Sequence, residues 1–304
     1  MADTTNSKLI DITRLSEYDA KIKAWAKELD EPIDQDFTTN NTVGALGSGT
    51  VITKDMTLAS LIAKMLVSVK DASVNTWPSC KLSNTGTAAT SYEVGTTINT
   101  VLNCPYTDGT FTSYKAGSNT QTEVINAGCV QTGPKYTKGG VEYAADSFIL
   151  GNGSNTITGS YTYSASTVKP KKSDGSESSI SIAANAKACS SSLTWTGYYK
   201  FYEGAVDAIP AVINRANVQG LNQGAYKTSF STKMNKKCYM ICIPENKTIH
   251  VKDTATNADL TGTMTKKEVS IEDAAGRAKT YYMWTCEYAS SVGLENNAIT
   301  ITFS

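Results

Sequence analysis

Short runs of alternating apolar and polar residues, separated by turn-forming residues, fill most of the chain from about residue 84 onward. Alternation with a period of two places successive side chains on opposite faces of a strand, so each run predicts a half-buried β-strand. Between residues 84 and 192 the runs are short, and Ser, Thr, Gly, Asn and Ala predominate. Strands at this spacing favour a small β-sandwich, and the alternation of Tyr, Val and Ile argues against disorder. The stretch 169–179 is expected to be an exposed loop.

Residues from about 193 onward predict longer strands with more aromatic residues. The alternating runs cover 193–206, 236–253, 279–290 and 298–304, and residues 205–221 predict a short helix or a turn. Cys238 and Cys242 lie four residues apart in one such run, which places them on the same strand face. This block is expected to close a second β-module.

The first 72 residues are different, because their apolar residues recur at spacings of three and four. One predicted helix has a heptad seam and ends before Pro32, and Ser16 with Asp19 resembles a capping box at its start. A second predicted helix is capped by Thr57 and also contains Leu66 and Val69 on its apolar face. The residues expected to form a trimer or attachment interface are Leu15, Tyr18, Ile22, Trp25, Leu29, Leu58, Leu61, Ile62 and Met65.

Three glycines before the second helix, Gly44, Gly47 and Gly49, raise the question of a phosphate-binding loop. A Walker loop requires Gly-Lys-Ser/Thr, whereas Gly49 is followed by Thr50 and Val51. A dinucleotide site requires G-x-G-x-x-G between a strand and a helix, and the order here is reversed. The glycines are therefore interpreted as turn residues.

Composition excludes several partners and cofactors. The net charge is +0, only 18% of residues are charged and Arg occurs only three times, so neither nucleic acid nor an anionic membrane is an expected partner. The start of the chain has no secretion signal, and no run reaches the 18 apolar residues of a membrane span. The seven cysteines form no C-x-x-C motif, and His250 is the only histidine. We expect reduced, buried thiols, no metal and no cofactor.

Few residues could support catalysis. A nucleophilic triad would have to use His250, which lies in a strand-like run without a nucleophile motif. Paired carboxylates remain formally possible among Asp146, Asp273, Glu287 and Glu295, but surface charges are the simpler interpretation. Seven aromatic residues could stack on sugars or form core and cross-strand pairs. They are Tyr198, Tyr199, Phe201, Tyr202, Tyr281, Tyr282 and Trp284.

Two stretches resemble parts of tailed-bacteriophage fibre proteins. The segment "VGALGSGTVITKDMTLASLIAKML" (43–66), followed by "SYEVGTTINTVLN" (91–103), resembles a connector that precedes an immunoglobulin-like module. The block from "GYYKFYEGAVDAIPAVINRANVQG" (197–220) to the end resembles a C-terminal β-module in fibres of phages infecting gut Bacteroidota, the crAss-like type. The resemblance implies a mainly β chain with short N-terminal helices (1–72), an immunoglobulin-like β-sandwich module (73–192) and a C-terminal β-sandwich module (193–304).

The same resemblance implies a non-enzymatic virion structural protein assembled in the host cytoplasm. The expected form is a short homotrimeric head (capsid) fibre or capsid decoration, anchored to other virion proteins by its N-terminal region and exposing its β-modules. The alternative is a tail fibre or adhesin whose terminal block binds a host-surface glycan. A polysaccharide depolymerase is the third hypothesis. Head or tail location, the anchoring protein and the copy number stay open.

Overall fold

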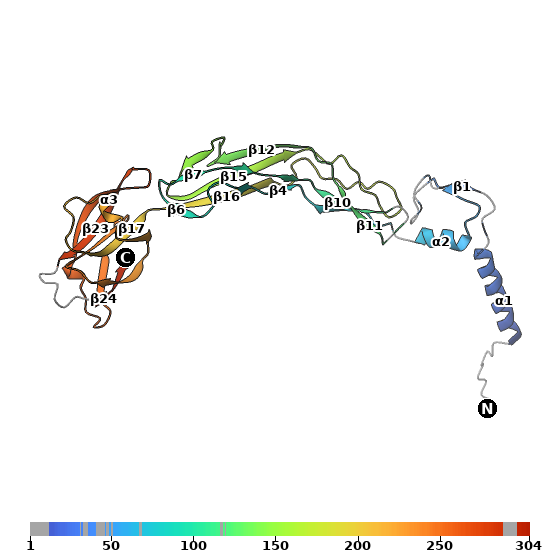
Figure 1. Ribbon diagram of the computed structural model, residues 1–304. Coiled ribbons are helices and arrows are strands. Elements are labelled where there is room, and N and C mark those ends of the chain that lie inside the picture. The colour runs from blue at the N-terminus through green and yellow to red at the C-terminus, as the bar shows by residue number, and fades with distance from the viewer. Residues whose placement is uncertain are drawn as a thin grey trace, which may run out of the picture. The chain divides into compact units, whose positions relative to one another are not determined.

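The computed structural model describes residues 12–30, 32, 36–40, 46, 49, 51–66, 69–115, 118, 120–287 and 297–304 (Figure 1). Strands far outnumber helices among the described residues, and the N-terminal helix is present, which confirms the prediction of a mainly β protein. The immunoglobulin-like character of the first β-module stays a prediction.

The chain forms two compact units. Unit 1 comprises Met1–Ser79, Tyr106–Thr132 and Thr162–Cys189, and unit 2 comprises Cys80–Pro105, Gly133–Tyr161 and Ser190–Ser304. Each unit gathers three segments, because the chain leaves it and returns. The predicted limits at residues 72 and 192 follow composition along the chain, and they stay a prediction.

Two helices belong to unit 1. Helix α1 spans Ile12–Leu29 and α2 spans Leu58–Leu66. The hydroxyl of Thr57 accepts a hydrogen bond from the Ser60 backbone N–H at 3.1 Å, which confirms the predicted cap of α2. The predicted capping box at Ser16 is wrong, because α1 already begins at Ile12 and Ser16 lies inside it. Gly49 adopts a left-handed φ of +83°, as expected of a turn glycine, whereas Gly44 and Gly47 lie outside the described residues.

A three-stranded antiparallel sheet forms the β part of unit 1, in the order β11 (Thr122–Asn126), β10 (Thr110–Tyr114), β3 (Ser73–Thr76). The stretch 169–179 belongs to this unit and is buried in part, which corrects the prediction of an exposed loop. Ser173 and Ser178 are buried; the Ser173 hydroxyl accepts from the Lys70 N–H at 2.9 Å, and the Ser178 hydroxyl donates to Asp71. These polar residues are buried because each has a hydrogen-bond partner.

A five-stranded sheet has the order β13 (Val141–Glu142), β12 (Gln131–Lys138), β15 (Gly153–Tyr163), β16 (Cys189–Tyr198), β6 (Ser91–Glu93). Within unit 2, Trp195 of β16 is fully buried with Ile98, Leu150 and Ile157. Its indole N–H donates to the Thr87 carbonyl at 3.1 Å, which satisfies the polar edge of the ring.

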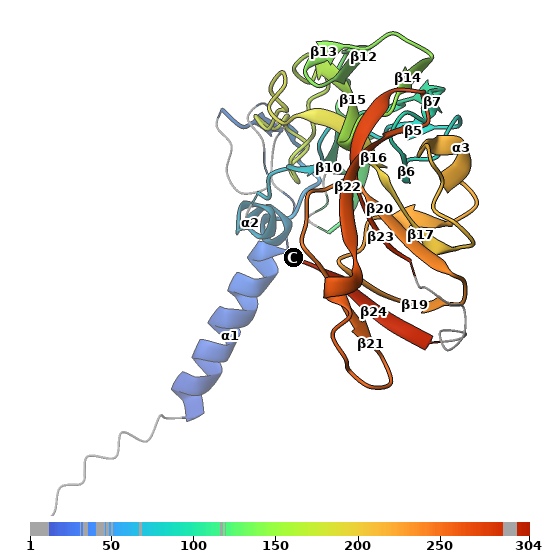
Figure 2. The same cartoon turned by 90° about the vertical axis from the view of Figure 1, so that its left-hand side faces the viewer.

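The end of the chain forms two further sheets in unit 2. One has the order β18 (Asn222–Ala225), β17 (Lys200–Val206), β20 (Cys238–Ile243), β23 (Ala278–Glu287), β22 (Thr265–Glu272). The other has the order β19 (Ser229–Met234), β24 (Asn297–Phe303), β21 (Ile249–Asp253), and Figure 2 shows these three strands together.

Strand β20 is buried on both faces. Tyr239, Ile241 and Ile243 contribute to one apolar cluster, and Met240 and Cys242 contribute to a second one. The period of two therefore divides a continuous apolar run between two cores. Helix α3 (Arg215–Val218) contributes Val218 to the second cluster, and it confirms the predicted short helix within 205–221.

The remaining elements are short. They are β1 (Phe37–Thr38), β2 (Val51–Ile52), β4 (Ser79–Cys80), β5 (Ser83–Asn84), β7 (Thr97–Asn99), β8 (Leu102–Asn103), β9 (Tyr106–Thr107), β14 (Ser147–Ile149) and the 3-10 helix η1 (Thr261–Thr263).

Candidate functional site

The apolar seam of α1 faces solvent in the single chain. Tyr18, Ile22 and Trp25 expose 66%, 60% and 61% of their surface. The side chains of Leu15 and Leu29 lie outside the described part of the chain. Large apolar side chains recurring along one helix face at this exposure are typical of a surface that is covered in an assembly.

Of the predicted interface residues on helix α2, one lies in the core and the others lie at the surface. Leu61 is buried in a small cluster with Leu46 and Ile52, so in the single chain it is a core residue, and its place in an intermolecular interface stays a prediction. Leu58, Ile62 and Met65 remain 37%, 37% and 42% exposed. The helix is thus anchored to its own unit by one residue and presents the others to solvent.

The residues considered for catalysis are not assembled for it. His250 is exposed on β21, where its Nε2 lies 3.1 Å from the Ser304 hydroxyl. Asp273 is buried and bound by Arg277, whose Nε lies 2.8 Å from its carboxylate. Asp146 and Glu287 are exposed, and Glu295 lies outside the described residues. Within the described ranges, no group of three or more His, Cys, Asp and Glu side chains could hold a metal ion.

All seven cysteines are free thiols, and all except Cys80 are buried. Burial, together with neighbouring Cys80, raises the pKa of Cys104 to about 11, and burial together with Asp108 raises the pKa of Cys129 to about 11. Burial also raises the pKa of Cys242 to about 12. These three thiols are therefore protonated near neutral pH and are poor nucleophiles.

The aromatic residues singled out above separate into two groups. Phe201, Tyr202, Tyr281 and Trp284 are buried in the two cores of the C-terminal sheets, and Tyr282 packs partly buried against one of them. Tyr198 and Tyr199 lie where the chain passes from β16 to β17, and they line a pocket instead. The change of strand interrupts the alternation, so neither ring joins a core.

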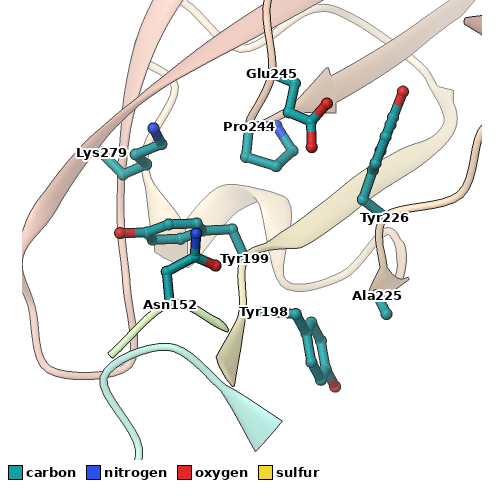
Figure 3. Close-up of a pocket in the computed structure, with 8 residues that line it drawn as sticks. All are labelled: Asn152, Tyr198, Tyr199, Ala225, Tyr226, Pro244, Glu245 and Lys279. Atoms are coloured by element: carbon teal, nitrogen blue, oxygen red, sulfur yellow. The ribbon is translucent and has the colours of Figure 1, made fainter. Parts of the chain in front are cut away.

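This pocket has a volume of about 240 Å³ and lies in unit 2 (Figure 3). Its walls come from five segments that are distant in the sequence, which is why sequence patterns did not identify it. The lining residues are Asn152, Tyr198, Tyr199, Ala225, Tyr226, Pro244, Glu245 and Lys279.

Aromatic rings and two opposite charges define the chemistry of the pocket. The Nζ of Lys279 lies 5.2 Å from the centre of the Tyr199 ring, a cation–π contact that fixes the lysine at one wall. The ring of Tyr226 is 5.8 Å from that of Phe303, centroid to centroid. Burial raises the pKa of Tyr226, and the charge of Glu245 raises it further. Among the described residues, only the Tyr226 hydroxyl is a buried side-chain polar atom without a hydrogen-bond partner.

A partly buried ion cluster in unit 2 was also absent from the sequence-based hypotheses. Glu93 lies at the end of β6. Its carboxylate accepts hydrogen bonds from the two terminal guanidinium nitrogens of Arg215, one of them at 2.8 Å, and forms an ion pair with the Lys200 ammonium at 3.0 Å. Burial raises the pKa of Glu93, but the hydrogen bonds and charges of Arg215 and Lys200 outweigh it and hold the pKa below its ordinary value. Because all of its partners are protein groups, we interpret the cluster as structural.

No helix in the described portion is both long and apolar enough to span a membrane. Comparisons with protein families, with curated proteins and with solved structures gave no match.

Proposed function

We propose that the chain is a non-enzymatic structural protein of a tailed-phage virion, a short head fibre that assembles as a homotrimer through α1. The observation that supports this proposal most directly is the uncovered apolar seam of α1. We propose the location, a virion that is assembled in the host cytoplasm, from the resemblance of residues 43–66, 91–103 and 197–304 to phage fibres.

The partner on the seam is two further copies of this chain. Tyr18, Ile22 and Trp25 follow the spacing of four and three that lets identical helices pack side chain into hole. Asp19 and Lys23 lie one helical turn apart and form an ion pair at 2.6 Å. Both side chains are exposed to solvent and neither belongs to the seam, which stays apolar. Other virion proteins, in capsid or tail, would bind the rest of the N-terminal region, where α2 exposes Leu58, Ile62 and Met65.

The energy available from the seam is appreciable. A Trp side chain buries roughly 150–250 Å² when fully covered. Since Trp25 is 61% exposed, association would cover about 120 Å². At about 25 cal/mol per Å², this corresponds to about 3 kcal/mol per chain, and so to about 9 kcal/mol for a trimer that covers three copies of Trp25.

Trp25→Ala is the corresponding test in purified full-length protein. We expect the variant to dissociate at a concentration about a thousand times higher than the wild type does, because three copies of Trp25 are lost and the midpoint concentration of a monomer–trimer equilibrium varies with the square root of its constant; sedimentation equilibrium measures it. Leu66→Ala is the matched control, because Leu66 is 80% exposed on α2 outside the α1 seam. Equal dissociation of the two variants would refute the assignment of the seam to self-association.

A glycan-binding adhesin is the second candidate function, and the aromatic pocket in unit 2 favours it. A depolymerase has no such support, because the candidate acids Asp146, Asp273 and Glu287 do not line this pocket.

A further inference from the structure

We propose that the pocket lined by Tyr199, Tyr226, Glu245 and Lys279 binds one neutral saccharide ring. This inference deepens the adhesin alternative by naming the site and the ligand class. It does not depend on trimer formation through α1, because every lining residue belongs to unit 2.

The size of the pocket limits the ligand. A volume of about 240 Å³ lies below the range of roughly 300–1,000 Å³ that is usual for drug-sized ligands. A single hexose ring at the end of a glycan is a compound of suitable size, with the rest of the glycan extending into solvent. A nucleotide or a coenzyme would be too large.

The lining is suited to a compound with both apolar faces and hydroxyl groups. Figure 3 shows Tyr199 and Lys279 on one side of the opening and Tyr226 and Glu245 on the other. Aromatic rings pack against the C–H faces of a sugar, and they lose little conformational entropy when they do so. Glu245 accepts hydrogen bonds only, and Lys279 donates them only. A sugar hydroxyl can do both, so neighbouring hydroxyls can use the two side chains together.

The charges select against ionised ligands. Lys279 would attract a carboxylate or phosphate but Glu245 would repel it, and an ammonium group would meet the opposite pair of forces. An ion of either sign therefore gains no net attraction to set against the hydration that it loses. Because the two charges lie in one small pocket, a neutral ligand is the class that meets neither repulsion.

Isothermal titration and saturation-transfer NMR with full-length protein test the proposal. The probes are D-glucose, D-galactose, D-mannose, L-fucose and N-acetyl-D-glucosamine, with D-glucuronate and D-glucosamine as anionic and cationic counterparts. We expect at least one neutral sugar to bind with a dissociation constant of about 1 mM, and its charged counterparts to bind at least about tenfold more weakly.

Two variants reverse this selectivity separately. Glu245→Gln removes the repulsion of anions and should improve the binding of glucuronate relative to the neutral sugar. Lys279→Met should improve the relative binding of glucosamine. Lys266→Met is the matched control, because Lys266 also makes a cation–π contact, 4.9 Å from the Trp284 ring, but does not line the pocket. It should leave sugar binding unchanged.

Failure of this proposal is distinct from failure of the trimer. The proposal is overturned if none of the neutral sugars binds at about 50 mM, well above the expected dissociation constant. It is also overturned if a charged sugar binds more tightly than its neutral counterpart, or if Lys266→Met weakens binding as much as Lys279→Met does. Sedimentation of the same protein reports on the trimer independently, because α1 does not contribute to the pocket.

Discussion

Glu93→Gln should destabilise unit 2 by removing the charge at the centre of the partly buried ion cluster. The side chain of Glu93 is 10% exposed, and those of Lys200 and Arg215 are 25% and 22% exposed. Removing one partner from a buried pair costs roughly 3–5 kcal/mol, because the remaining charge stays buried without compensation. Gln keeps one acceptor oxygen and the two cations keep some solvent, so we expect about 3 kcal/mol, the lower end of that range.

The assay is urea unfolding at pH 7, followed by tryptophan fluorescence, since Trp195 and Trp284 both lie in unit 2. Asp207→Asn is the matched control, because the pair formed by Asp207 and Lys236 is 87% and 45% exposed and water screens it. A loss below about 0.5 kcal/mol in Glu93→Gln would refute the inference that the cluster stabilises the fold.

The pH dependence has a definite sign. The pKa of Glu93 is lower in the folded chain than its ordinary value of 4.5. The stabilisation is therefore complete above that value and is lost as the pH falls through the folded pKa. The difference in unfolding free energy between wild type and Glu93→Gln should be constant from neutral pH to about pH 5.5 and then shrink on acidification. A difference that grows on acidification would contradict this account.

Three further predictions concern other parts of the chain. Gly197→Ala should destabilise unit 2 by about 3 kcal/mol, because an added Cβ would lie 1.9 Å from the Gly151 carbonyl oxygen. Gly220→Ala should be tolerated, because nothing lies within 4 Å of the added Cβ, and comparable melting temperatures for the two variants would refute this prediction. With a thiol reagent at pH 8, only Cys80 should react quickly in the native protein, because the other six thiols are buried away from the reagent. All seven cysteines should react after denaturation without reductant, and several fast-reacting native thiols would contradict this. A chain lacking residues 1–66 should still fold, because it keeps the hydrogen bonds of Lys70 and Asp71 with Ser173 and Ser178. It should fail to join particles, because it lacks the proposed attachment region, and normal incorporation would place that region elsewhere.

Periodicity predicted the elements that depend on local sequence. The two N-terminal helices, the cap at Thr57 and the strand containing His250 follow from spacing alone, because period and capping are properties of neighbouring residues. The capping box at Ser16 failed for the same reason, since its pattern also occurs inside a helix that begins earlier.

Contacts between distant residues could not be predicted in this way. Glu93 and Arg215 are 122 residues apart, and no local pattern relates them. The pocket likewise depends on Tyr226 and Lys279, whose strands or loops meet Tyr199 only after folding. Periodicity predicts that Leu61 and Leu66 share one apolar helix face, yet one is buried and the other 80% exposed. The reason is that five residues turn a helix by about 140° beyond one full turn, and the partners Leu46 and Ile52 cover only the side of Leu61.

The mass of the full-length protein in solution tests the central claim most directly. We propose that three copies cover the seam formed by Tyr18, Ile22 and Trp25. Sedimentation equilibrium at micromolar concentration should therefore give three times the chain mass of 32.5 kDa, and the chain lacking residues 1–66 should be monomeric. A stable monomer or a dimer of the full-length protein would contradict the account.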